Sequence, residues 1–303
     1  MATPPVNLWV VLSESRRIIK AHSRHFFALS VLFLLPSSLC TAVYPTISRL
    51  ITEQSPKTVI LLSVAYLVVV SVFNLLAIGS IAYSIFQRFY GRPVKLISAV
   101  KSSLSSFFPL HATLISMTSI LLGIFLVLAF AAFLLKTLME IIIPGLEISF
   151  LAFAVIVTII AIIVMFKFQV DWILSLVIVV VESVWGLKPL KISKSLTKGM
   201  RRVSLSILLF FIVTSLPLGW ISSATAPFAR IETGRLWTTR NAYFMLQIVI
   251  VSAFQTFLML YNVAATTVMY IYCKDFHGEV GKYVSLPFDD DDGKLLNLAY
   301  NNV

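Results

Sequence analysis

Histidines, and polar residues inside long apolar segments, are the side chains in this sequence that could carry chemistry. The four histidines are His22, His25, His111 and His277, and only the first two have the i, i+3 spacing of a helical metal-binding pair. No set of Cys or carboxylate residues accompanies that pair, as a zinc site would require. The sequence also contains no Gly-rich phosphate loop, no Gly-x-Ser-x-Gly and no His-Glu-x-x-His motif. We therefore predict a protein that is not an enzyme and that has no catalytic residue, metal site or cofactor.

Three polar residues occupy similar positions inside apolar segments. Asn74, Asp171 and Asn262 precede the glycine that ends each segment by 17, 15 and 16 residues, which predicts a similar depth for all three. Lys167 lies four residues before Asp171, so the two charges can pair along a helix. One hypothesis is that these four residues form a polar pathway or binding site within a membrane. The commoner use of such residues is interhelical hydrogen bonding that holds a bundle together.

The elements that carry these residues are predicted to be membrane-spanning helices. Of the 303 residues, 59% are hydrophobic and 12% are charged, whereas an average soluble domain is about 25% charged. Apolar segments occur at about residues 26–47, 58–86, 111–135, 148–186, 204–226 and 242–272. Each is long enough to cross a bilayer, and helices satisfy their own backbone groups in lipid. The predicted fold class is therefore all-α, a polytopic membrane bundle of six transmembrane helices.

The distribution of cations predicts the orientation of this bundle. With the N-terminus in the cytoplasm, 17 of the 24 Lys and Arg residues lie in cytoplasmic segments and six lie in outer loops. This split places both termini in the cytoplasm. Segment 148–186 could instead be two spans broken near Phe166–Asp171, which would give seven spans and put the most cationic loop outside. We favour one long, kinked helix, because seven spans would violate the positive-inside rule.

The chain also contains an internal repeat. When Pro93 is aligned with Pro189, apolar residues follow both prolines at offsets of +3, +7, +11 and +14, which lie on one face of a helix. A weaker copy of this pattern begins near Leu8. We predict a single membrane domain, residues 1–280, built from three repeats at about 7–91, 92–186 and 187–278. Each repeat would be an amphipathic helix followed by a transmembrane hairpin, ending in a glycine with the positive φ that suits a helix C-terminus.

Basic residues occupy the polar faces of the three amphipathic helices. They are Arg16, Arg17 and Lys20 in the first, Arg92, Lys95 and Lys101 in the second, and Lys188, Lys191, Lys194, Lys198, Arg201 and Arg202 in the third. We predict that these faces bind the lipid bilayer at its anionic cytoplasmic leaflet. Each cation near that surface contributes about 1 kcal/mol, and insertion of the apolar stripe adds more. Nucleic-acid binding is not predicted from the net charge of +11, because the cations separate apolar segments.

Two further features concern the cytoplasmic side. The tail, residues 281–303, contains the run Asp289–Asp292 and is predicted to be disordered and cytoplasmic, as a candidate segment for binding a protein partner.

Cys40 and Cys273 are predicted to lie near opposite faces of the bilayer, so they would not form a disulfide. Cys273 would be either a buried small residue or a palmitoylation site.

Two motifs carry a resemblance to a known family. The segments "YGRPVKLISAV" (Tyr90–Val100) and "PLKISKSLTKG" (Pro189–Gly199) resemble those of a plant family of multi-pass membrane proteins of uncharacterised function. The likeness extends from about residue 7 to 280, and the second motif is also similar to the membrane domain of some bacterial glycerophosphodiester phosphodiesterases. The resemblance implies an endomembrane or plasma-membrane location and no reaction, since no phosphodiesterase catalytic domain is visible.

Two main hypotheses of function follow. The first is a non-enzymatic integral membrane protein of scaffold or trafficking type, whose basic amphipathic helices bind the cytoplasmic leaflet. The alternative is a small-solute transporter or channel, with polar mid-membrane residues between three repeats. A third hypothesis is a membrane-embedded lipid enzyme, but the sequence shows no nucleophile paired with a general base. The sequence carries no sign of an oligomeric state.

Overall fold

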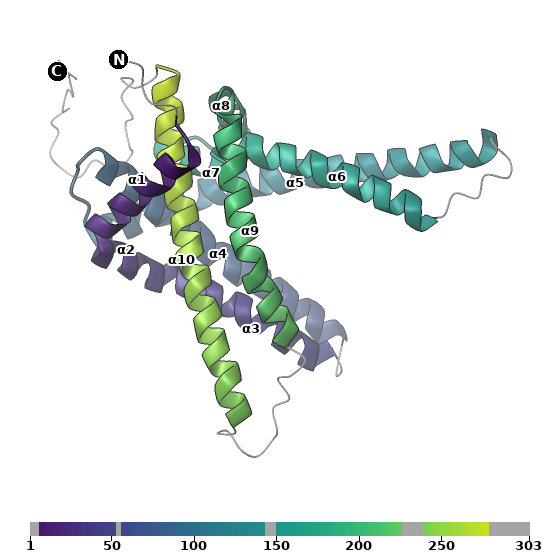
Figure 1. Ribbon diagram of the computed structural model, residues 1–303, viewed down its shortest axis with the longest axis horizontal. Coiled ribbons are helices and arrows are strands. Elements are labelled where there is room, and N and C mark those ends of the chain that lie inside the picture. Colours follow the sequence, from purple (N-terminus) through teal and green to yellow (C-terminus); the bar gives the residue numbers. More distant parts are fainter. Residues whose placement is uncertain (1–5, 53–55, 143–149, 226–238, 279–303) are drawn as a thin grey trace.

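The structure, a computed structural model, describes residues 6–52, 56–142, 150–225 and 239–278, and in these residues it is built of helices with no strand (Figure 1). The predicted all-α fold class is therefore confirmed. The acidic tail, most of the loop before residue 239 and the predictions made for them lie outside the described residues.

The helices follow the three predicted units in order. The first unit contains α1 (Leu8–Ala21), α2 (Ser23–Leu29), a π-helical turn η1 (Ser30–Leu34), α3 (Leu35–Thr52) and α4 (Pro56–Phe89). The second contains α5 (Leu96–Ile142), α6 (Phe150–Trp172) and α7 (Ser175–Glu182). The third contains α8 (Lys188–Thr197), α9 (Arg201–Thr225) and α10 (Thr239–Phe276). The threefold duplication itself stays a prediction.

Six helical segments in the described residues are long and apolar enough to cross a membrane. They are Ser23–Ser48, Lys57–Phe89, Leu96–Leu138, Phe153–Glu182, Arg201–Ser222 and Met245–Phe276. The fourth of these is interrupted at Ile173 and Leu174, between α6 and α7. Because α7 has only eight residues, it is too short to span alone. The helix continues through Phe166–Asp171, where the seven-span alternative would break it, so the number of candidate spans is the six that were predicted.

The three predicted glycine stops adopt the expected conformation. Gly91, Gly186 and Gly278 have φ values of 73°, 75° and 69°. A side chain at such a φ clashes with the backbone, which is why glycine is favoured there. At Gly91 the chain also closes as a helix C-terminus does, because the Arg92 amide donates to the carbonyl of Gln87 at 3.0 Å.

One predicted amphipathic helix is not a separate element. The residues after Gly91 enter α5, which continues for 47 residues from Leu96 to Ile142. In contrast, α1 is separated from α2 at His22, and α8 from α9 near Gly199, whose φ is 97°. No comparable positive-φ residue lies inside α5, so the helix passes through Pro109 without a break.

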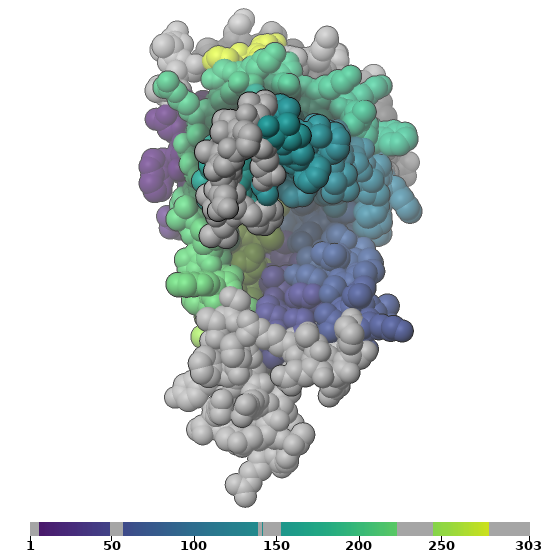
Figure 2. Space-filling model, turned by 90° about the vertical axis from the view of Figure 1, so that its right-hand side faces the viewer, coloured from purple at the N-terminus to yellow at the C-terminus, as the bar shows by residue number. Residues whose placement is uncertain are grey.

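Helix packing concentrates at one end of the molecule. The α1 helix, α8 and the C-terminal end of α10 lie together at the top of Figure 1. The main core forms near this end, where buried residues of α4, α7 and α10 such as Ile85, Ile178 and Met269 pack together. The α5–α6 hairpin projects away from this core, and it points toward the viewer in Figure 2. Its outer half exposes large apolar side chains, as expected of helices covered by lipid.

Candidate membrane-surface site

Every cation predicted to face a membrane surface is exposed in the structure. The twelve residues are Arg16, Arg17 and Lys20 of α1, Arg92 and Lys95 in the turn before α5, Lys101 of α5, Lys188, Lys191 and Lys194 of α8, Lys198 after it, and Arg201 and Arg202 of α9. We call this set the basic face. Arg17 pairs with Glu14 at 3.6 Å in the same helix, but a surface pair of this kind contributes little and leaves Arg17 open to solvent.

The apolar stripes of α1 and α8 lie against the bundle, which differs from the prediction that they insert into lipid. In α1, Val11, Ile18 and Ile19 are buried, and the helix packs on α10 and α4. In α8, Leu190 and Leu196 are buried, and the helix packs on α6 and α7. A helical stripe has the same spacing whether it faces protein or lipid, so periodicity alone could not distinguish the two cases.

Aromatic and aliphatic side chains surround the basic face. Trp9 of α1 is 74% exposed, and Trp185, three residues before α8, is 66% exposed. Ile97, in the first turn of α5, is 80% exposed. Trp prefers the interfacial layer of a bilayer, where its ring is among carbon atoms and its N–H meets water or head groups. These residues can therefore anchor the basic face at the level of lipid head groups.

An ion pair between a buried carboxylate and a half-exposed cation of the basic face fixes the start of α9. Asp171 Oδ1 lies 3.2 Å from Arg201 Nη2, with the Asp171 side chain 4% exposed. The Ser193 hydroxyl of α8 donates to the carbonyl oxygen of Asp171 at 2.8 Å. Lys167 is exposed and is not the partner of Asp171, in contrast to the predicted i, i+4 pair. The ion pair thus joins α6, α8 and α9.

The structure does not bring the three polar residues to one depth. Asp171 lies within reach of the first residue of α9, and Gly199, just before α9, packs on Phe276 at the end of α10. Asn262 is 14 residues earlier in α10, which is roughly 21 Å along a helix. The interruption at Ile173 and Leu174 explains the difference, because counting residues back from Gly186 gives a depth only where the helical rise continues unbroken up to that glycine.

The polar side chains of the spans contact near neighbours. Ser37 of α3 donates to Asn74 Oδ1 at 3.0 Å, which joins α3 to α4. The Thr266 hydroxyl lies 3.3 Å from the side-chain oxygen Oδ1 of Asn262 and donates to it, within α10. Between α10 and α3, the Thr256 hydroxyl lies 3.0 Å from that of Ser38. These contacts are those of interhelical and intrahelical hydrogen bonding rather than of groups turned toward a shared pathway.

A second polar cluster, which the sequence analysis did not recognise, joins α7 to α10. Glu182 Oε1 accepts a hydrogen bond from the Tyr270 hydroxyl at 2.7 Å and an ion-paired bond from Lys274 Nζ at 2.9 Å. A signal for it was present, because Glu182 and Lys274 each lie four residues before a repeat glycine, as Gln87 does in the first unit. Gln87 is buried at the end of α4, and its Oε1 has no hydrogen-bond partner among the described residues.

Arg88 connects the ends of α4 and α1. Its Nη1 lies 3.0 Å from His22 Nδ1, and its Nη2 donates to the carbonyl of Val94 at 3.0 Å. Partial burial, with the nearby Arg88 charge, lowers the pKa of His22 below its ordinary value. The lowered pKa favours the neutral imidazole ring, which can accept a hydrogen bond from the guanidinium. In the described residues, no group of three or more His, Cys, Asp or Glu side chains could hold a metal ion.

Cys273 is fully buried in α10, with its sulfur 3.6 Å from that of Met200. This placement supports the interpretation of Cys273 as a small buried residue over that of a palmitoylation site, because an acylated thiol must be accessible.

The fold and the basic face together define a class. It is a helical protein whose described residues include six segments long and apolar enough to cross a membrane, with a cationic surface at one end. The chain belongs to the family of DUF8558, a domain of unknown function, which matches residues 41–286. That range begins inside α3, so α1 and α2 lie outside the matched region. No curated protein and no solved structure matches the chain.

Proposed function

We propose that this protein is a non-enzymatic, multi-pass integral membrane protein of scaffold or trafficking type, which binds anionic lipid head groups through its basic face. The observation that carries the proposal is that α1 and α8 each have one face packed on the bundle and an opposite, exposed cationic face. Their apolar residues hold the helices on the bundle, while their cations are exposed. The spans would keep this rigid cationic surface at the level of one leaflet.

Electrostatics is the main attractive force in this arrangement. Each Lys or Arg near an anionic leaflet contributes about 1 kcal/mol, and the attraction falls off within a Debye length of about 8 Å. Because the stripes of α1 and α8 are already buried in protein, apolar insertion is left to exposed side chains such as Trp9 and Trp185. Binding of anionic head groups should therefore weaken as salt is raised.

The remaining parts of the proposal follow from the sequence. The excess of Lys and Arg at the ends of the spans that carry the basic face supports a cytoplasmic location for that face and for both termini. The likeness to the plant family and to the membrane domain of some glycerophosphodiester phosphodiesterases supports an endomembrane or plasma-membrane site. The acidic tail is proposed to bind a protein partner. The side-chain contacts of Asn74 with Ser37 and of Asn262 with Thr266 favour this proposal over a solute pathway.

Charge reversal on α8 tests the proposal. The full-length protein would be extracted from vesicles of phosphatidylcholine and phosphatidylserine, and the lipids retained on it would be counted by native mass spectrometry. We expect the combined substitution of Lys188, Lys191, Lys194 and Lys198 by Glu to lower the retained phosphatidylserine at least about tenfold. Retained phosphatidylcholine should not change.

Two controls separate charge from damage to the fold. Substitution of the same four lysines by Arg keeps the charge and should retain phosphatidylserine within about twofold of the unaltered protein. Lys57→Glu changes an exposed cation at the start of α4 and should have no effect. Equal retention of phosphatidylserine by the Glu and Arg variants would refute the proposal.

A further inference from the structure

The C-terminal end of α10 is held against the bundle at the end that carries the basic face (Figure 1). Lys274 Nζ binds Glu182 Oε1 of α7 at 2.9 Å. The Phe276 ring packs on Gly199, between α8 and α9, where a Cβ atom would lie 3.0 Å from the ring. Gly278 then ends the helix with a φ of 69°. The part of the chain that follows Gly278 therefore starts beside the basic face.

The lysines of the basic face nearest to this point are exposed and have no acidic partner among the described residues. They lie three or four residues apart, on one side of α8 and its C-terminal end, and they are Lys188, Lys191, Lys194 and Lys198. In contrast, Arg17 of α1 pairs with Glu14, and Arg201 of α9 pairs with Asp171. Like charges at this spacing repel one another, so an anionic segment placed over the α8 lysines would be stabilising.

The sequence after Gly278 carries the opposite charge. Residues 279–303 contain five acidic residues and two lysines, and four of the five acids form the run Asp289–Asp292. The run begins 11 residues after Gly278, and 11 residues of chain span at most roughly 36–40 Å. The α8 helix has 10 residues and is therefore about 15 Å long. The run can thus reach the whole length of α8 from the point where α10 ends.

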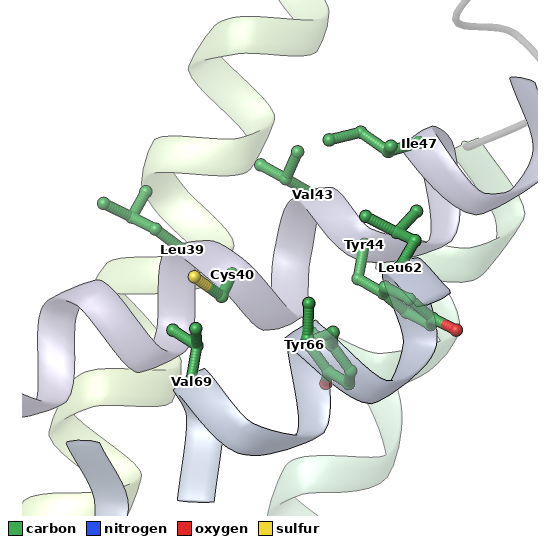
Figure 3. Close-up of a pocket in the computed structure, with 9 residues that line it drawn as sticks. Leu39, Cys40, Val43, Tyr44, Ile47, Leu62, Tyr66 and Val69 are labelled. Atoms are coloured by element: carbon green, nitrogen blue, oxygen red, sulfur yellow. The ribbon is translucent and has the colours of Figure 1, made fainter. Parts of the chain in front are cut away.

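The open groove between α3 and α4 offers an acidic segment no such partner (Figure 3). It is lined by aliphatic side chains, by Cys40 and by the rings of Tyr44 and Tyr66, which stack on each other with centroids 4.0 Å apart. No charged side chain is among the described residues that line it. The charge of the acidic run is therefore complementary to the basic face and not to this groove.

We propose that the run Asp289–Asp292 binds the α8 lysines of the same chain and thereby competes with anionic lipid head groups. This inference rests on the proposed function, because it names a competitor for the same lysines. Where anionic lipid is scarce, the run covers α8, and where it is abundant, head groups displace the run by mass action. The protein would then bind head groups strongly only in membranes rich in anionic lipid, and displacement would release the tail for its protein partner.

The contact is tested by joining touching carboxylates and amines with a zero-length carbodiimide. The full-length protein would be treated in an uncharged detergent at low salt, and linked peptides would be mapped by mass spectrometry. We expect Asp289–Asp292 to link to the α8 lysines of the same chain at least about tenfold more than to Lys57, an exposed lysine at the start of α4. Added phosphatidylserine should lower this linkage. Equal linkage to Lys57, or linkage only between two chains, would overturn the inference.

A matched pair of tail variants tests the competition. Replacing all four residues Asp289–Asp292 by Asn removes the charge of the run, whereas replacing them by Glu keeps it. With limiting phosphatidylserine, the Asn variant should retain at least about threefold more of this lipid than the unaltered protein, because its competitor is gone. The Glu variant should stay within about twofold of the unaltered protein. Equal retention by the Asn and Glu variants would reject the competition.

These measurements distinguish failure of this inference from failure of the proposed function. If charge reversal of the α8 lysines lowers phosphatidylserine retention but the Asn variant of the tail does not raise it, head-group binding stands and the role of the tail is rejected. If the run links to α8 in a protein that retains no excess of phosphatidylserine, head-group binding is refuted while the docking of the run is supported.

Discussion

At the scale of single residues, the Asp171–Arg201 pair is the most informative contact beneath the basic face. Its two side chains differ in environment, with Asp171 4% exposed and Arg201 51% exposed. Removing Arg201 would leave a carboxylate inside the protein without its ion-pair partner, whereas removing the charge of Asp171 would leave a guanidinium that water can solvate. The two changes should therefore differ in cost.

We predict that Arg201→Ala lowers stability by about 3–5 kcal/mol, the usual cost of leaving a buried charge unpaired. Asp171→Asn should cost only about 1 kcal/mol, because Asn is nearly the same size and Arg201 stays solvated. Thermal unfolding of the purified protein in one detergent would measure both. The double variant Asp171→Asn/Arg201→Ala is expected to be more stable than Arg201→Ala alone. An Arg201→Ala protein with the same melting temperature as the unaltered protein would contradict this account.

Individual residues also show what the sequence could predict at a site. The cationic side of the basic face was predictable, because exposed Lys residues recur at helical spacing in α8 and share one direction. The partner of Asp171 was not predictable, since Arg201 is 30 residues away in the sequence and approaches through the fold. The Glu182–Lys274 bridge joins residues 92 apart, and only the repeat spacing hinted at it.

At the scale of helices, the sequence was informative wherever the cause is local. Positive φ at Gly91, Gly186 and Gly278 was predicted because only local backbone sterics are involved. A local cause also explains η1, which the sequence analysis did not predict. Pro36 has no amide hydrogen, and the wider turn directly before it is closed by the Leu35 amide, which donates to the carbonyl of Ser30.

Tertiary packing decided the features that the sequence analysis missed. Whether the stripe of α1 faces lipid or protein depends on α10, and whether the chain after Gly91 forms a separate helix depends on how α5 packs on α4. The α4–α5 contact itself uses small residues. The Ser103 hydroxyl donates to the carbonyl of Leu76 at 2.6 Å, and Gly79 lies opposite Ser103. Such close approach of backbones is typical of helices that pack in membranes.

We predict that Gly79→Val separates α4 from α5. A Cβ atom at Gly79 would lie 3.0 Å from Ser103 Cα, a backbone atom that cannot turn aside. The expected loss of stability is about 1–3 kcal/mol, as for other overpacked contacts. Gly123→Val in α5 is the matched control, since nothing lies within 4 Å of a Cβ placed there. Unfolding in detergent should distinguish the two variants, and equal melting temperatures would show that the α4–α5 contact is not tight.

At the scale of the whole molecule, the two ends differ in both chemistry and packing. The end with α1 and α8 holds the basic face, the Glu182–Lys274 bridge and most of the core. The other half of the spans is less covered by protein, as the exposed side chains of the α5–α6 hairpin show. The packed, cationic end with α1 and α8 is consistent with a surface that binds lipid head groups. The exposed apolar sides of the spans are consistent with contact with acyl chains.

The predicted orientation can be tested with the whole molecule by labelling single cysteines. Cys40 would be replaced by Ala, whereas Cys273 can stay because it is buried. New cysteines at Arg17, Lys194 and Lys57 sample α1, α8 and the start of α4, and all three positions are exposed. A membrane-impermeant maleimide added to sealed right-side-out vesicles should label only Lys57→Cys. In inside-out vesicles it should label Arg17→Cys and Lys194→Cys, because six spans place the basic face and both termini on the same side. Labelling of Lys194→Cys and Lys57→Cys from the same side would mean that the chain crosses the membrane an even number of times between them, instead of the three times that the candidate spans give. That result would contradict the six-span arrangement and with it the rigid cytoplasmic display on which head-group binding depends.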